Sequence, residues 1–107
     1  MSEIFATIKK QLRENDVVLY MKGSKTMPRC GFSATVVQVL QNLGVDFKDV
    51  DILEDENIRQ GIKDFANWPT IPQLYIKGEF IGGCDIVRQL YQTGELKHIL
   101  ENNNILV

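Results

Sequence analysis

The pattern of apolar and polar positions predicts short strands that alternate with amphipathic helices. The uninterrupted apolar run at residues 17–21 is typical of a strand buried on both faces. A helical repeat comes before this run, carried by Ile4, Phe5, Ile8 and Leu12. A second helical repeat occupies residues 31–43. Gly44 is expected to end it, because glycine adopts the left-handed conformation of a helix C-terminus most easily.

The second half of the chain continues the alternation. It predicts a strand over 45–52, a helix over 58–66 with an acidic start, strands at 74–76 and 80–81 around Lys77-Gly78, and helices over 85–91 and 95–100. A strand, a helix and a strand of these lengths form a parallel pair with a right-handed crossover. The predicted fold class is therefore α/β, with a four-stranded mixed β-sheet flanked by helices, an extra N-terminal helix, and one domain over residues 1–107.

The composition is that of an ordinary globular protein, and it argues against several classes of function. The chain has 107 residues, of which 44% are hydrophobic and 24% are charged. Its net charge of −2 argues against general nucleic-acid binding. No apolar run approaches the roughly 18 residues of a membrane-spanning helix, and the N-terminus lacks the basic start of a secretory signal. We therefore expect a cytoplasmic protein with neither nucleic-acid nor membrane partners.

Cys30 is the strongest candidate for chemistry. It lies between a polar loop at residues 22–29 and the start of the helix predicted over 31–43. Unpaired backbone N–H groups and the positive end of the helix dipole favour a thiolate at such a position. Ser33 stands where a dithiol oxidoreductase carries its second cysteine, so we expect Cys30 to act as a single activated thiol. The alternative is that Cys30 is a small, buried and inert side chain.

The chain offers few other metal-binding or redox groups. It contains two cysteines, Cys30 and Cys84, and one histidine, His98. A structural disulfide is not expected in a cytosolic protein, although oxidation of Cys84 against Cys30 stays open. A closed zinc site needs four ligands, which this set does not supply without carboxylates. His98 lies far in sequence from the candidate motifs and is expected to be structural or at the surface.

Three motifs together resemble one family. They are Cys30-Gly31-Phe32-Ser33, Trp68-Pro69-Thr70-Ile71-Pro72-Gln73 and Gly82-Gly83-Cys84-Asp85. Their order and spacing resemble those of the monothiol, CGFS-type glutaredoxins of the single-domain bacterial or organellar kind. The resemblance implies a thioredoxin fold, a redox-active cysteine at residue 30, a glutathione site, and a cis peptide bond before Pro72.

The resemblance assigns five positions to the glutathione site: Lys22, Arg59, Ile71, Cys84 and Asp85. Lys22 and Arg59 would bind carboxylates. The backbone of Ile71 would pair with the extended tripeptide, and the N–H groups of Cys84 and Asp85 would take its γ-glutamyl carboxylate. The alternatives are a plain surface lysine at Lys22, a salt bridge from Arg59 to an acidic neighbour on its own helix, and a helix N-cap at Asp85.

Other polar and aromatic residues near these motifs are given simpler roles. Solvated surface charges are expected at Lys25, Arg29 and Lys63. Packing rather than catalytic roles are expected at Tyr20, Phe32 and Trp68.

The number of available thiolates suggests the function. A [2Fe-2S] cluster takes four thiolate ligands, and two chains with two glutathiones supply four if each chain gives only Cys30. The resemblance implies a homodimer bridged by a [2Fe-2S] cluster, with Cys30 as the metal ligand. It further implies a role in iron-sulfur cluster assembly, transfer to apo recipient proteins, and a heterodimer with a BolA-family protein.

An enzyme remains the alternative. It would be a glutathione-dependent monothiol oxidoreductase that reduces protein–glutathione mixed disulfides through Cys30. The sequence separates the two hypotheses poorly, because both use the same glutathione groove. An adaptor with no redox or metal role would leave the thiol and the basic groove unexplained.

Overall fold

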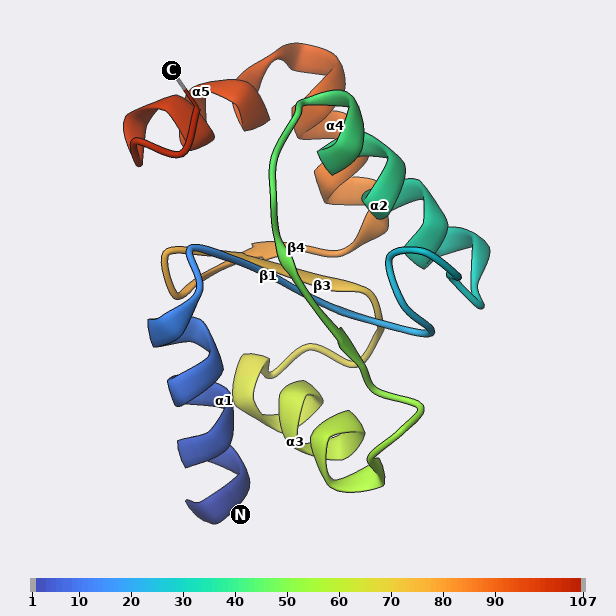
Figure 1. Cartoon of the computed structure of the whole chain (residues 1–107). Helices are drawn as coiled ribbons and strands as arrows, with labels where there is room; N and C mark the ends of the chain where they lie inside the picture. Colours follow the sequence, from blue (N-terminus) through green and yellow to red (C-terminus); the bar gives the residue numbers. More distant parts are fainter. Residues whose placement is uncertain (1, 107) are drawn as a thin grey trace.

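The computed structural model describes residues 2–106 and arranges them in three layers (Figure 1). A four-stranded sheet forms the middle layer. One face is covered by α1 (Ser2–Glu14) and α3 (Glu56–Ala66), and the other by α2 (Gly31–Asn42), α4 (Cys84–Thr93) and α5 (Glu95–Asn102). The predicted α/β architecture, including the extra N-terminal helix, is confirmed.

The sheet is mixed, as the alternation of elements predicted. Its strand order is β2-β1-β3-β4, with bounds Val17–Met21 for β1, Lys48–Asp51 for β2, Gln73–Ile76 for β3 and Glu79–Gly82 for β4. β1 runs parallel to β2 and antiparallel to β3. The C-terminal ends of β1 and β2 and the N-terminal end of β3 therefore lie at the same end of the sheet, where the candidate site forms.

The central strand β1 carries the core on both of its faces. Leu19 packs toward the cluster that includes Leu40 of α2, and Tyr20 packs toward the cluster that includes Ile62 of α3. All five residues of β1 are buried, which explains the uninterrupted apolar run in the sequence. Each large side chain buried in this way contributes about 1.5–3 kcal/mol, so the two clusters fix the strand ends that support the site.

Two local predictions have different outcomes. The turn at Lys77-Gly78 is confirmed as a two-residue hairpin, with φ of 52° and 79° at the two residues, as a type I′ turn requires. The strand predicted over 45–52 is too long, because pairing with β1 begins only at Lys48. Val45 and Phe47 are buried against the core from an irregular segment, and their apolar character caused the over-extension.

The length and hydropathy of the described helices were compared with those of a membrane-spanning helix. None of those within residues 2–106 is long and apolar enough to cross a bilayer.

Candidate active-site cavity

A cavity of about 510 Å³ opens at the end of the sheet where β1 and β2 finish. Five segments meet around it: the residue after β1, the start of α2, one residue of α3, residues 68–72 before β3, and the start of α4. These segments are far apart in sequence and are brought together by the mixed sheet. Five of the six predicted site residues line the cavity, namely Lys22, Cys30, Ile71, Cys84 and Asp85.

Cys30 stands at the N-terminus of α2, where it is the N-cap in an extended conformation. The N–H of Ser33 is the main reason that the pKa of the Cys30 thiol lies below its ordinary value. Partial burial opposes this effect, while the N–H of Phe32 and the charge of Lys22 reinforce it. These groups favour the thiolate over the thiol, because N–H donors and a nearby cation stabilise the negatively charged form. The expected activation of Cys30 therefore has a structural cause.

Ser33 has a role that the sequence analysis missed. Its side chain is fully buried, and its Oγ accepts a hydrogen bond from the backbone N–H of Lys22 at 3.1 Å. Ser33 thus acts on two site residues, since its N–H favours the Cys30 thiolate and its hydroxyl holds the backbone at Lys22. The pattern of the sequence contains no local signal for this contact, because the two residues belong to different elements.

The cations near the cavity differ from the predicted set. Lys63 was expected to be a solvated surface charge, but it lines the cavity together with Lys22. Arg59 is absent from the lining, and its Nη1 lies 3.1 Å from Oε1 of Glu56, which is the predicted alternative. The Arg59 side chain is 42% exposed and that of Glu56 75% exposed, and ion pairs at a surface contribute only about 0–1 kcal/mol. The guanidinium of Arg59 is therefore free to exchange Glu56 for another carboxylate.

The segment before β3 presents an unpaired peptide to the cavity. The Ile71-Pro72 bond is cis, as the resemblance implied. Pairing of β3 with β1 ends at Gln73, and within residues 2–106 the N–H and C=O of Ile71 have no hydrogen-bond partner. Since Ile71 lines the cavity, an extended peptide placed there has a free backbone edge with which to pair.

The start of α4 supplies free donors, but its cap differs from the prediction. The N-cap is Gly83, whose C=O accepts from the N–H of Val87 at 2.9 Å, so the alternative role of Asp85 as the helix N-cap is wrong. Because the helix begins at Cys84, the carboxylate of Asp85 is left exposed near the cavity. Within the described chain the N–H groups of Cys84 and Asp85 have no acceptor, and a helix start of this kind attracts an anion.

Gly82 lets α4 begin close to the end of β4. Its φ is +153°, and a Cβ at this position would lie 2.8 Å from Cβ of Ile86. The glycine is therefore required by the close packing of helix and strand, which in turn holds the N-terminus of α4 against the cavity.

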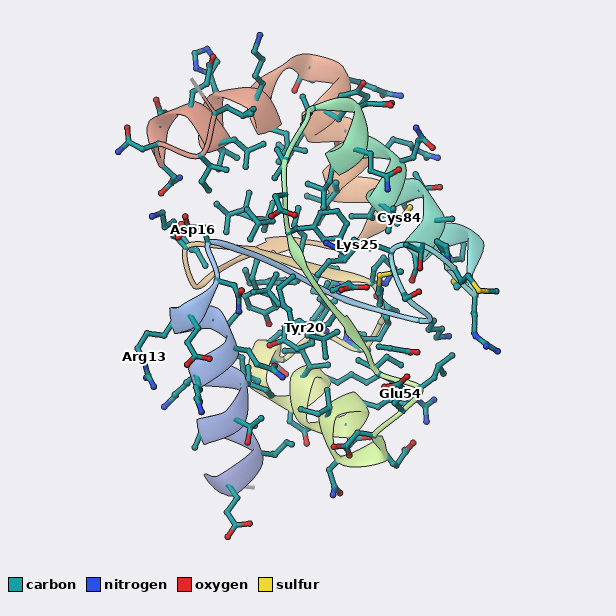
Figure 2. All side chains as sticks on the ribbon, viewed as in Figure 1. Arg13, Asp16, Tyr20, Lys25, Glu54 and Cys84 are labelled. Carbon is teal, nitrogen blue, oxygen red and sulfur yellow. The ribbon has the colours of Figure 1, made fainter. Side chains whose placement is uncertain are left out.

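Cys84 is the second thiol of the cavity and has the opposite acid–base character. Burial, and next the charge of Asp85, raise the pKa of Cys84. Both cysteines are free thiols. Figure 2 shows Cys84 on the α2 side of the sheet, away from the layer in which Tyr20 lies. At neutral pH the cavity therefore offers one activated thiol and one ordinary, protonated thiol.

The aromatic residues predicted to pack divide into two groups. Tyr20 is buried and donates from its hydroxyl to Oε1 of Gln11 at 2.7 Å, which confirms its packing role. Trp68 packs against Phe80 with ring centroids 5.6 Å apart, but it also lines the cavity. Phe32 is 64% exposed at the cavity rim, so its predicted packing role is wrong. His98 lies at the surface, as expected.

The chain is similar to known proteins over most of its length. Residues 17–81 match the family model described as Glutaredoxin. A protein described as probable monothiol glutaredoxin 2 from Rickettsia typhi is 53% identical over 100 residues, which cover 94% of this chain and 90% of that protein.

Solved structures give the same result. The solution structure of reduced poplar apo GrxS14 has a TM-score of 0.84 and 51% identity, covering 94% of this chain and 92% of that one. The crystal structure of the holo form of glutaredoxin C1 from Populus tremula x tremuloides has a TM-score of 0.80 and 27% identity, covering 97% and 95% of the two chains. The likeness to apo GrxS14 confirms the predicted thioredoxin-like fold.

Proposed function

The chain belongs to the glutaredoxin family, among its monothiol members, and we propose that it carries a [2Fe-2S] cluster as cargo for iron-sulfur cluster assembly. Two copies of the chain are bridged by the cluster, and each copy contributes Cys30 and one bound glutathione. The proposal depends above all on one observation, which is a single thiol of lowered pKa beside a cavity that suits a tripeptide.

The ligand count supports a shared site. A [2Fe-2S] cluster takes four thiolates. Within residues 2–106, no three His, Cys, Asp or Glu side chains are placed together to hold a metal. Cys84 is a less favourable ligand than Cys30, because its pKa is raised and a metal must displace the thiol proton. Cys30 is therefore the one protein ligand of each copy, and the remaining thiolates come from outside the chain.

The cavity offers complementary groups to each part of glutathione. The cations of Lys22 and Lys63 suit its carboxylates, with Arg59 available if it leaves Glu56. The free backbone of Ile71 suits the central peptide groups. A glutathione bound in this way would have its thiol next to Cys30.

The start of α4 completes the proposed glutathione site. The γ-glutamyl end carries both a carboxylate and an ammonium group. The free N–H groups of Cys84 and Asp85 suit the carboxylate, and the exposed side chain of Asp85 suits the ammonium. A glutathione held by several weak polar contacts dissociates readily, which suits a protein that must release its cargo.

Related structures point in the same direction. A holo form is known for glutaredoxin C1, and an apo form for GrxS14. We propose that the present chain also has a holo form and an apo form. The proposal includes apo iron-sulfur proteins as recipients, a BolA-family protein as an alternative partner, and a cytoplasmic location.

The second candidate function is that of a monothiol oxidoreductase. The partial exposure of Cys30 and its lowered pKa also suit attack on the sulfur of a protein–glutathione mixed disulfide. Cys30 would take the glutathionyl group and release the protein thiolate, and a second glutathione would then form glutathione disulfide and restore Cys30. One preparation assayed both for this turnover and for cluster transfer to an apo-ferredoxin separates the two functions. We expect ready transfer and little turnover.

The first test is anaerobic reconstitution with iron, sulfide and glutathione, followed by an ultraviolet–visible spectrum. Cys30→Ser is expected to abolish the cluster spectrum, while Cys84→Ser is the matched control and is expected to keep it. Thermal unfolding of both variants checks that each is folded. A Cys30→Ser protein that reconstitutes like the wild type would contradict the proposal.

A further inference from the structure

The loop between Lys22 and Cys30 is folded rather than irregular. Gly23 and Pro28 form an isolated antiparallel bridge. The N–H of Arg29 donates to the C=O of Lys22 at 2.9 Å, and Ser24 and Met27 exchange two backbone hydrogen bonds of 3.2 and 3.1 Å. This small hairpin joins the cation of the site to its thiol, so a shift of one end is transmitted to the other.

Two carboxylates of β2 hold this hairpin from the side. Oδ1 of Asp51 accepts from the N–H of Gly23 at 3.0 Å, and also from the N–H of Leu53 at 3.0 Å. Oδ2 of Asp49 accepts from the N–H of Lys25 at 2.8 Å. These bonds join loop and strand residues that are 28 and 24 positions apart in the sequence.

Lys25 provides a further attachment of the loop. Its Nζ donates to the C=O of Phe47 at 2.6 Å and lies 4.7 Å from the centre of the Phe47 ring. Figure 2 shows this side chain reaching back from the loop toward the segment that leads into β2. The far half of the loop is therefore anchored independently of Asp51, which leaves Asp51 to control the near half, beside Lys22.

Gly23 cannot adjust easily to the loss of the Asp51 bond. Its φ is +88°, and a Cβ here would lie 2.5 Å from the C=O oxygen of Met27. The backbone of the loop is therefore tightly packed at Gly23, the residue whose N–H donates to Asp51. The peptide on the other side of Lys22 is held by Ser33, so the lysine is fixed between two side-chain acceptors.

We propose that Asp51 is a positioning residue of the site, which acts through Lys22 by fixing the peptide that follows it. Asp51 sets the direction in which the Lys22 ammonium faces Cys30 and the carboxylate of a bound ligand. The part that concerns the ligand rests on the proposed glutathione site, whereas the part that concerns Cys30 does not.

Three variants separate this role from a charge effect. Asp51→Ala removes the acceptor. Asp51→Asn removes the charge but keeps an oxygen that can accept both N–H groups. Asp46→Ala removes a fully exposed carboxylate from the same region, which lies 3.7 Å from Nζ of Lys25 and accepts from the N–H of Phe47 at 3.1 Å. Thermal unfolding of each variant records its stability separately. If Asp51→Ala does not fold, Asp51→Glu takes its place, because the longer side chain displaces the same carboxylate.

The main readout is the rate of alkylation of Cys30 by iodoacetamide at pH 7, resolved from Cys84 by peptide mass spectrometry. We expect slower alkylation in Asp51→Ala and near wild-type rates in Asp51→Asn and Asp46→Ala. In a Lys22→Met background, Asp51→Ala should have no further effect, because the residue through which it acts is gone. A wild-type rate in Asp51→Ala, equal slowing in Asp46→Ala, or full slowing in the Lys22→Met background would each overturn the proposal.

The second readout is glutathione affinity by calorimetry. We expect Asp51→Ala to weaken binding about tenfold, equivalent to about 1.4 kcal/mol, and Asp51→Asn to restore it. An unchanged affinity would overturn the part of the proposal that concerns the ligand. If the wild type binds no glutathione, the proposed function fails, but the alkylation rates still decide whether Asp51 positions Lys22.

Discussion

Removing the hydroxyl of Ser33 tests the connection between thiol and cation most simply. In Ser33→Ala, the N–H of Lys22 loses its acceptor at 3.1 Å. An unsatisfied backbone N–H costs about 1–3 kcal/mol when it is buried, and this one is only partly buried. The higher helix propensity of alanine returns up to about 0.5 kcal/mol. We therefore expect a loss of about 1–2 kcal/mol in the free energy of unfolding, or roughly 4–10 °C in Tm.

The same change should slow the alkylation of Cys30. The Ser33 side chain and the Lys22 charge both lower the pKa of Cys30, although the main contribution, the N–H of Ser33, is retained. The matched control is Thr35→Ala, which removes a hydroxyl that donates to the C=O of Gly31 and contacts the Cys84 thiol rather than Lys22. Calorimetric unfolding and the iodoacetamide rate are measured on both variants. If Ser33→Ala matches Thr35→Ala in both measurements, the hydroxyl of Ser33 has no role in holding Lys22.

Three further predictions concern acid–base behaviour and the core. As pH rises toward 8, Cys30 should be alkylated before Cys84, because the pKa of the first is lowered and that of the second is raised; equal rates for the two peptides would contradict this. Leu40→Ala should cost about 2–5 kcal/mol in urea unfolding, since Leu40 is fully buried, whereas Leu53→Ala at a 51% exposed position should stay within about 0.5 kcal/mol. Burial raises the pKa of Tyr75 to about 12, so the unfolded chain loses this proton first and stability should fall above about pH 10; a 295 nm tyrosinate signal of the folded protein that appears near pH 10 and is lost in Tyr75→Phe would refute the assignment.

Much of the fold could be predicted from the sequence because its signals are local. The buried run of β1 and the Lys77-Gly78 turn each determine their own conformation. Errors arose where the environment decides the outcome. Phe47 is apolar because it packs on the core beside β2, not because it belongs to the strand. Asp85 has a capping side chain, but the glycine two positions earlier lets the helix begin sooner.

The site shows the same division between local and distant causes. Cys30 could be identified from the sequence because the free N–H groups and the dipole of a helix start favour a thiolate there without any distant contact. The contacts of Ser33 with Lys22 and of Asp51 with Gly23 join different elements, so no periodicity reveals them. Arg59 and Lys63 lie one turn apart on the same face of α3, so the choice between them depends on which turn of the helix meets the cavity, and helical spacing alone does not decide this.

In the proposed function, one cluster is held by Cys30 and glutathione from each of two copies. The most direct measurement is native mass spectrometry of the protein reconstituted anaerobically in the presence of glutathione. We expect a dimer that contains about two irons, two sulfides and two glutathiones, whose thiolates together with Cys30 of each copy make four. A cluster-containing dimer without bound glutathione, or a cluster on a monomer, would contradict the proposed function.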